Sequence, residues 1–168
     1  MIELDQIWSK MLSDAGENAA NAGRHDIAEY LRLKASNDAI RIAGVAWLFN
    51  TVIEIAVLAE RDQYGVAIER EDPHSFKFST SNMVGSLVRI RHGVRCLTIE
   101  AGWARTPSDG VMRNGSLAAG RITHFGMPKN NAEIRFVHLD SLPQWLGSDG
   151  HLVDAAAISS HFEKLFGV

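Results

Sequence analysis

The first third of the chain carries hydrophobic side chains at the three- and four-residue spacing of amphipathic helices. This spacing predicts a first helix before Gly16, with an apolar stripe made by Leu4, Ile7, Trp8, Met11 and Leu12. An apolar stripe of this kind has to be buried against another surface. The stripe is therefore also the first candidate for the contact of a homodimer.

Capping residues divide the rest of this region into two further helices. Asp26 followed by Glu29 matches the capping box and predicts a second helix over residues 25–35. A third, long helix over residues 39–62 is expected to begin after three successive capping residues, Ser36, Asn37 and Asp38. Residues 42–59 approach bilayer length but include polar side chains, so we interpret this segment as a core helix.

The second part of the chain shows instead the two-residue alternation that is typical of half-buried strands. Two short strands are expected at residues 66–70 and 76–78. A turn at Pro73 separates them, because proline removes a donor from the hydrogen-bond ladder. Further strands are expected at residues 119–125 and 133–139, and the sheet as a whole is predicted to be antiparallel.

The clearest local signal is a hairpin in which residues 84–91 and 94–103 flank a two-residue turn, His92–Gly93. This turn implies three opposed pairs: Arg91 with Val94, Arg89 with Cys96, and Val88 with Leu97. Opposed residues share one side of a sheet, so one face carries the apolar residues Val84, Val88, Ile90, Leu97, Ile99, Ala101 and Trp103. The other face carries Arg89, Arg91, Cys96, Thr98 and Glu100.

Together these elements predict an α+β fold. Three N-terminal helices are followed by an antiparallel sheet of about five or six strands packed on the long third helix, and then by a C-terminal helix capped by Asp154. The chain has 168 residues, which is near the usual size of one domain. We therefore expect a single domain over residues 1–168, with a helical half (1–63), a sheet (64–152) and the C-terminal helix (153–168).

Composition and motifs exclude several classes of protein. Apolar residues make up 46% of the chain and charged residues 22%, as in globular proteins. The single cysteine, Cys96, cannot form an internal disulfide or a four-cysteine zinc site. Nucleotide-binding glycine motifs and metal-binding histidine spacings are missing, so we expect no cofactor and no metal. The first residues lack a basic segment followed by an apolar run, so a cytoplasmic location is expected.

Charge is distributed unevenly along the chain. The net charge is −3, too small for bulk attraction to nucleic acid or to an anionic membrane, so a membrane partner is not expected. Residues 66–140 nevertheless carry 10 basic against 7 acidic groups. The basic residues between Gly85 and Phe125 are all arginine. Arginine forms paired hydrogen bonds with carboxylates and phosphates, which would favour an anionic partner. The alternative explanation for the excess of arginine is codon bias.

These arginines lie on the polar hairpin face and in the loop that follows it. The loop, residues 104–116, is longer than a usual hairpin connection. The candidate partner-binding residues are Arg89, Arg91, Trp103, Arg105, Asp109, Arg113 and Asn114. They favour a non-enzymatic binding or regulatory protein that engages an anionic partner. This partner is an acidic protein surface or, as the less favoured alternative, a nucleic-acid backbone. The alternative without a binding function is a solvated sheet face whose charged side chains prevent pairing with the strands of other molecules.

A second hypothesis is a small enzyme. Glu100, His124 and His138 could act as acid and base groups, with arginines orienting an anionic substrate in a pocket between sheet and loop. His124 and His138 lie in two expected strands, and antiparallel pairing would bring them near each other. No known catalytic motif surrounds these residues. Cys96 is interpreted as a half-buried strand residue rather than a nucleophile.

Overall fold

The computed structural model describes residues 2–62, 64–138 and 142–168. By contacts, the chain divides into two compact units, Met1–Ala43 and Gly44–Val168. One long helix, α2 (His25–Arg61), passes from the first unit into the second.

The first unit is a pair of helices. Helix α1 (Ile2–Asn21) is followed by a short turn and then by the first part of α2. The two helices are joined at Asp38, which is only 5% exposed. Its carboxylate accepts hydrogen bonds from Trp8 Nε1 of α1 (3.2 Å) and from Arg41 Nη1 (2.6 Å). A buried carboxylate therefore ties the helices of this unit together.

The prediction of three helices before the sheet is wrong, because residues 25–61 form one continuous helix. Ser36, Asn37 and Asp38 lie inside α2 instead of beginning a new helix. Such residues favour caps because their side chains compete for backbone N–H groups. Here the Asp38 side chain binds Trp8, Lys34 and Arg41 instead, so it leaves the helical backbone bonds intact.

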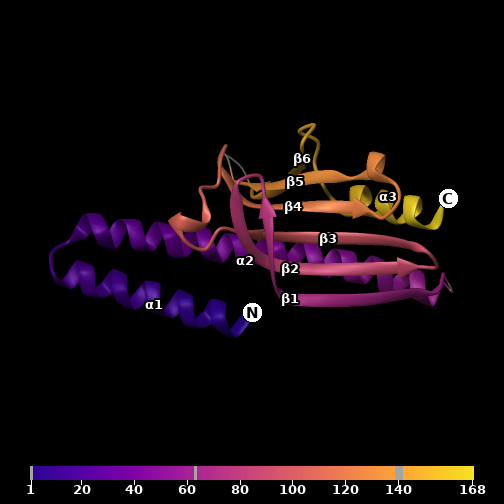
Figure 1. The fold of residues 1–168 in the computed structure, drawn as a ribbon. Coiled ribbons are helices and arrows are strands. Elements are labelled where there is room, and N and C mark those ends of the chain that lie inside the picture. Colours follow the sequence, from indigo (N-terminus) through magenta and orange to yellow (C-terminus); the bar gives the residue numbers. More distant parts are fainter. Residues whose placement is uncertain (1, 63, 139–141) are drawn as a thin grey trace. The chain divides into compact units, whose positions relative to one another are not determined.

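The second unit contains a six-stranded antiparallel sheet in which each strand pairs with its neighbours in the chain (Figure 1). This confirms the predicted α+β class and the antiparallel sheet. Two short 3-10 turns, η1 (Pro107–Asp109) and η2 (Pro128–Asn130), lie in the connections on either side of β4. The strands are β1 (Val66–Phe78), β2 (Ser81–His92), β3 (Arg95–Trp103), β4 (Ser116–His124), β5 (Ala132–Val137) and β6 (Gln144–Gly147). The expected strand at residues 133–139 ends at Leu139, which lies outside the described residues.

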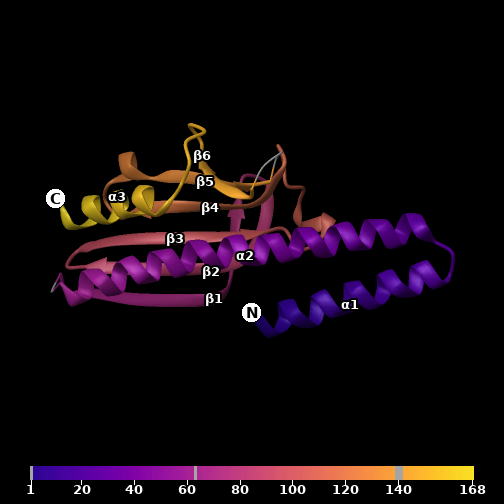
Figure 2. The ribbon, with the colours of Figure 1, turned by 180° about the vertical axis from the view of Figure 1, so that it is seen from behind.

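The second part of α2 and helix α3 (Ala155–Phe166) cover one face of this sheet (Figure 2). Trp145 of β6 donates a hydrogen bond from Nε1 to the carbonyl oxygen of Gly44 (2.9 Å), which fixes α2 to the edge of the sheet. The predicted cap of α3 is confirmed, because Asp154 accepts a hydrogen bond from the Ala157 N–H (2.8 Å). The core between these layers contains Leu48, Phe49, Val52, Val88, Ile90, Leu97, Ile99, Ile122, Ile134, Ile158 and Leu165.

Helix α2 is long and apolar enough to cross a membrane if length and composition alone are considered. Within the second unit, however, its side chains Leu48 and Val52 are completely buried in the core. The polar residues Asn50 and Glu54 are exposed. One face of this part of α2 therefore packs in the core, whereas Trp47, Val57 and Leu58 are exposed.

The hairpin is present, but its turn lies one residue later than predicted. The pairing sets His92 opposite Arg95, so the two loop residues are Gly93 and Val94. Gly93 has a φ of 58°, as the first loop residue of a type II′ turn requires. The three predicted pairs are wrong, and Arg91 lies opposite Cys96 instead. The partners shift by two positions, so the predicted separation into an apolar and a polar face is confirmed.

Strand β1 continues through the turn predicted at Pro73. Its register shifts between Glu71 and His74, which is a local bulge rather than an end. Proline is tolerated there because β1 is an edge strand with a free side. Beyond the bulge, β1 turns across the neighbouring strands (Figure 1). Phe78, Met83 and Ala119 then form a small separate core on the face opposite the helices.

Candidate functional site

The arginines of the polar sheet face are matched by carboxylates of β1. Arg91 Nε lies 3.0 Å from Glu69 Oε1, and Arg89 Nη1 lies 3.9 Å from Glu71 Oε2. A shallow depression of about 500 Å³ contains both arginines, together with Cys96, whose Sγ lies 3.7 Å from Thr98 Oγ1. The face is therefore polar, but its positive charges are largely balanced.

Glu100 belongs to an ion-pair cluster that joins three strands. Its carboxylate lies 2.9 Å from His74 Nε2 and 3.1 Å from Arg121 Nη1. The other ring nitrogen of His74 lies 3.0 Å from Glu71 Oε1, and this hydrogen bond lowers the pKa of Glu71 below its usual range. Both nitrogens of His74 thus have carboxylate partners, so neither is available to move a substrate proton. We interpret the cluster as a clamp that holds β1 on β3 and β4.

Loss of the Glu100 charge should destabilise the protein more than loss of an exposed charge. Glu100 is 16% exposed at its side chain, and Glu100→Gln removes the charge that faces His74 and Arg121. We expect the free energy of unfolding to fall by about 1 kcal/mol. The matched control Glu69→Gln, with a side chain 49% exposed, should cost less than about 0.5 kcal/mol. Urea unfolding of both variants measures the difference, and equal losses would contradict a clamp.

His124 lies on the opposite face of the sheet, where it meets a histidine that the sequence did not indicate. Its Nε2 lies 2.9 Å from Nδ1 of His161 on α3, and the two rings stack with centroids 5.2 Å apart. Burial and then the nearby Lys164 charge lower the pKa of His124. Burial, Lys164 and His124 lower the pKa of His161 to about 4. The pair is therefore neutral near physiological pH.

The predicted proximity of His124 and His138 is wrong. The register of β4 and β5 sets Ser116 opposite Val137, so His138 lies beyond the end of β4 that is far from His124. His138 is exposed and follows β5. Residues of two strands meet only if the register places them together, and this register was not known from the spacing.

Two of the predicted partner-binding residues have structural roles. Asp109 accepts hydrogen bonds from the Thr106 hydroxyl (2.7 Å) and the Thr106 N–H (3.1 Å), which closes the η1 turn. Trp103 is only 3% exposed, and the Arg105 guanidinium lies over its ring at 3.9 Å from the centroid. Trp103 is consequently covered by the protein's own side chains.

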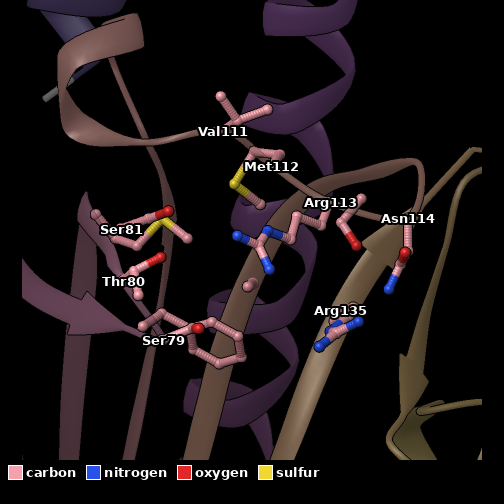
Figure 3. A pocket seen from close by; sticks show the side chains of 12 residues that line it. Ser79, Thr80, Ser81, Val111, Met112, Arg113, Asn114 and Arg135 are labelled. Atoms are coloured by element: carbon pink, nitrogen blue, oxygen red, sulfur yellow. The ribbon is translucent and has the colours of Figure 1, made fainter.

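The end of this loop forms one wall of a pocket of about 210 Å³ (Figure 3). The opposite wall is the β1–β2 turn, and the floor is the small core of Phe78, Met83 and Ala119. The loop approaches β2 closely at Gly110, whose φ is 129°; a Cβ atom there would lie within 2.9 Å of three atoms of Ser81. The pocket is lined by Phe78, Ser79, Thr80, Ser81, Met83, Val111, Met112, Arg113, Asn114, Ser116, Ala119 and Arg135.

The pocket is rich in hydrogen-bond donors and positive charge. In Figure 3 the Arg113 guanidinium lies between the β1–β2 turn and Asn114, with Arg135 close to Asn114. None of the lining residues is acidic, and within the described ranges neither arginine has a carboxylate partner. Ser116 is 6% exposed, and its buried Oγ has no hydrogen-bond partner among residues 2–62, 64–138 and 142–168.

Each of the two loops that flank the pocket contains a residue other than glycine with a positive φ. Ser79 has a φ of 53° and Asn114 a φ of 57°. Such values suit tight turns: Ser79 lies in the two-residue loop between β1 and β2, and Asn114 precedes Gly115, whose φ is also positive. Both residues line the pocket.

Comparison with known protein families, curated proteins and solved structures finds no match to this chain. Arg113 and Asn114 were predicted from the loop, whereas Arg135, Ser116 and the β1–β2 turn were missed. Arg135 lies between the buried residues Ile134 and Phe136 of β5, and this alternation was the available signal that it faces the polar side.

Proposed function

We propose that this protein is a non-enzymatic binding protein that engages an anionic group of its partner in the pocket between Ser79–Ser81 and the 104–116 loop. The observation that carries this proposal is the pair of guanidinium groups, Arg113 and Arg135, with no carboxylate partner in the described parts of the chain. Two unmatched positive charges with nearby hydroxyl and amide donors favour an anion.

The residues of the enzyme hypothesis lie elsewhere. Glu100, His124 and His138 do not line the pocket, and His74 has both ring nitrogens bound to carboxylates. Acid–base catalysis needs a titratable group within hydrogen-bond reach of the reacting atoms. These observations support binding over catalysis.

The shape of the site favours a projecting acidic group over a nucleic-acid backbone. A phosphodiester backbone is bound along an extended row of cationic groups. Here the positive charge is concentrated in one pocket, while Arg89 and Arg91 on the open face have carboxylate partners. An acidic side chain or small anion fits this arrangement better.

A titration followed by NMR tests the proposal. Acetate and inorganic phosphate, added separately to the ¹⁵N-labelled chain, should shift amide signals of Ser79–Ser81 and residues 111–116 with saturation. Arg113→Gln with Arg135→Gln should weaken binding at least tenfold. The control Arg89→Gln with Arg91→Gln removes the same charge and should change affinity less than twofold. If only the control variant Arg89→Gln with Arg91→Gln loses binding, the site lies on the open face instead. A lack of saturating shifts at the pocket would reject the proposal.

A further inference from the structure

We infer that the anionic group which the pocket takes is the phosphate of a small organic phosphate monoester, with its organic part lying against Met83 and Met112. This inference rests on the proposed function and names its ligand class. It follows from three properties of the pocket: the number of its donors, the apolar part of its lining, and the unsatisfied hydroxyl of Ser116.

The donors outnumber what a carboxylate can accept. Arg113 and Arg135 each carry five N–H groups, and Asn114 carries two. Four residues with hydroxyl groups also line the pocket: Ser79, Thr80, Ser81 and Ser116. A carboxylate has one negative charge and two oxygens, whereas a phosphate monoester has three terminal oxygens and nearly two charges at neutral pH. The phosphate therefore matches the two positive charges and can accept more of these hydrogen bonds than a carboxylate can.

The apolar part of the lining argues for an ester rather than free phosphate. Phe78, Met83 and Ala119 are buried on one side of the pocket, and Met112 packs against them. Inorganic phosphate would leave this surface in contact with water. A small carbon group covers it, and methionine side chains adapt readily to such a group. The volume of about 210 Å³ is below the roughly 300 Å³ at which pockets for drug-sized ligands begin, so the organic group is small.

Ser116 gives the site a specific signature. A buried hydroxyl without a partner destabilises the free protein, whereas a ligand oxygen within reach would satisfy it. Ser116→Ala should therefore leave the melting temperature of the free protein unchanged or raised. At the same time it should weaken the binding of the phosphate monoester. A residue that only supports the fold would lower the melting temperature instead.

Calorimetric titration of the full chain with three probes tests the ligand class. At pH 7.5 and constant ionic strength, phenyl phosphate should bind at least tenfold more tightly than benzoate and at least threefold more tightly than inorganic phosphate. Ser116→Ala should lower the affinity for phenyl phosphate at least threefold. The control Ser108→Ala, at an exposed hydroxyl of the same loop, should change affinity less than twofold.

Each alternative outcome has a distinct meaning. Tighter binding of benzoate that still depends on Arg113 and Arg135 would overturn the phosphate assignment and leave the proposed function standing. Equal affinities for inorganic phosphate and phenyl phosphate would overturn the inference that an organic group lies against Met83 and Met112. If no probe binds, or if the arginine pair has no effect, both the ligand class and the proposed function fail.

Discussion

Replacing Gly44 by alanine should lower the free energy of unfolding by about 2 kcal/mol, although alanine is the better helix former. A Cβ atom at this position would lie within 2.7 Å of three ring atoms of Phe136. Phe136 is 4% exposed and packs on Trp145, which itself donates a hydrogen bond to the Gly44 carbonyl, so the ring cannot move away freely. Overpacking costs about 1 to 3 kcal/mol, which exceeds the helix-propensity gain of at most about 1 kcal/mol.

Gly16 provides a matched control for this substitution. It also lies inside a helix, but the nearest atom to its Cβ position would be 3.8 Å away, an ordinary contact. Gly16→Ala should therefore raise stability by up to about 1 kcal/mol. Urea unfolding of both variants gives the comparison, and Phe136→Leu should recover part of the loss in Gly44→Ala. Stabilisation by both alanines would refute close packing of α2 on β5.

Stability should fall as the pH decreases from about 6.5 towards about 4, because of His124 and His161. Their pKa values are lowered in the folded protein, His161 to about 4, by burial and by the Lys164 charge. Between these pH values the unfolded chain binds more protons than the folded one, so acid favours unfolding. This part of the stability is fully present above pH 6.5 and is lost progressively as the pH falls. For His161 the loss reaches roughly 2 to 3 kcal/mol near pH 4.

Comparison of variants isolates this effect from the titration of carboxylates. His161→Gln keeps a hydrogen-bonding group beside His124 but removes the group with the largest shift. Unfolding in urea at pH 4.5, 5.5, 6.5 and 7.5 should show a flatter pH dependence than in the parent chain. His138→Gln, at an exposed histidine, should leave the profile unchanged. Equal flattening in both variants would contradict a role for the buried pair.

The features that the sequence predicts well depend on side-chain periodicity. The change from helical to alternating spacing gives the α+β class, and the alternation separates the faces of the hairpin even though the turn lies at Gly93–Val94. Asp154 begins α3 because its side chain meets a free N–H group. The helix start predicted after Asp38 is wrong because the Asp38 carboxylate binds the side chains of Trp8 and Arg41 rather than free backbone N–H groups. Local spacing does not reveal these partners.

The candidate site was predictable only in part, because its residues meet through register and strand bending. Arg113 and Asn114 are marked by their long loop, but Arg135 reaches the same pocket only through the pairing of β4 with β5. His161 meets His124 only because α3 packs on the sheet. The single-domain organisation, the homodimer contact and the cytoplasmic location stay predictions.

The order of the strands has a consequence for how the sheet is made. Because every strand pairs with the one before it, the sequence separation between paired residues stays short throughout the sheet. Short separations reduce the entropy lost in closing loops and favour rapid folding. During synthesis, each new strand can add to the growing edge as it leaves the ribosome. The residues that line the pocket all lie between positions 78 and 135, so they all precede β6 and α3 in the chain.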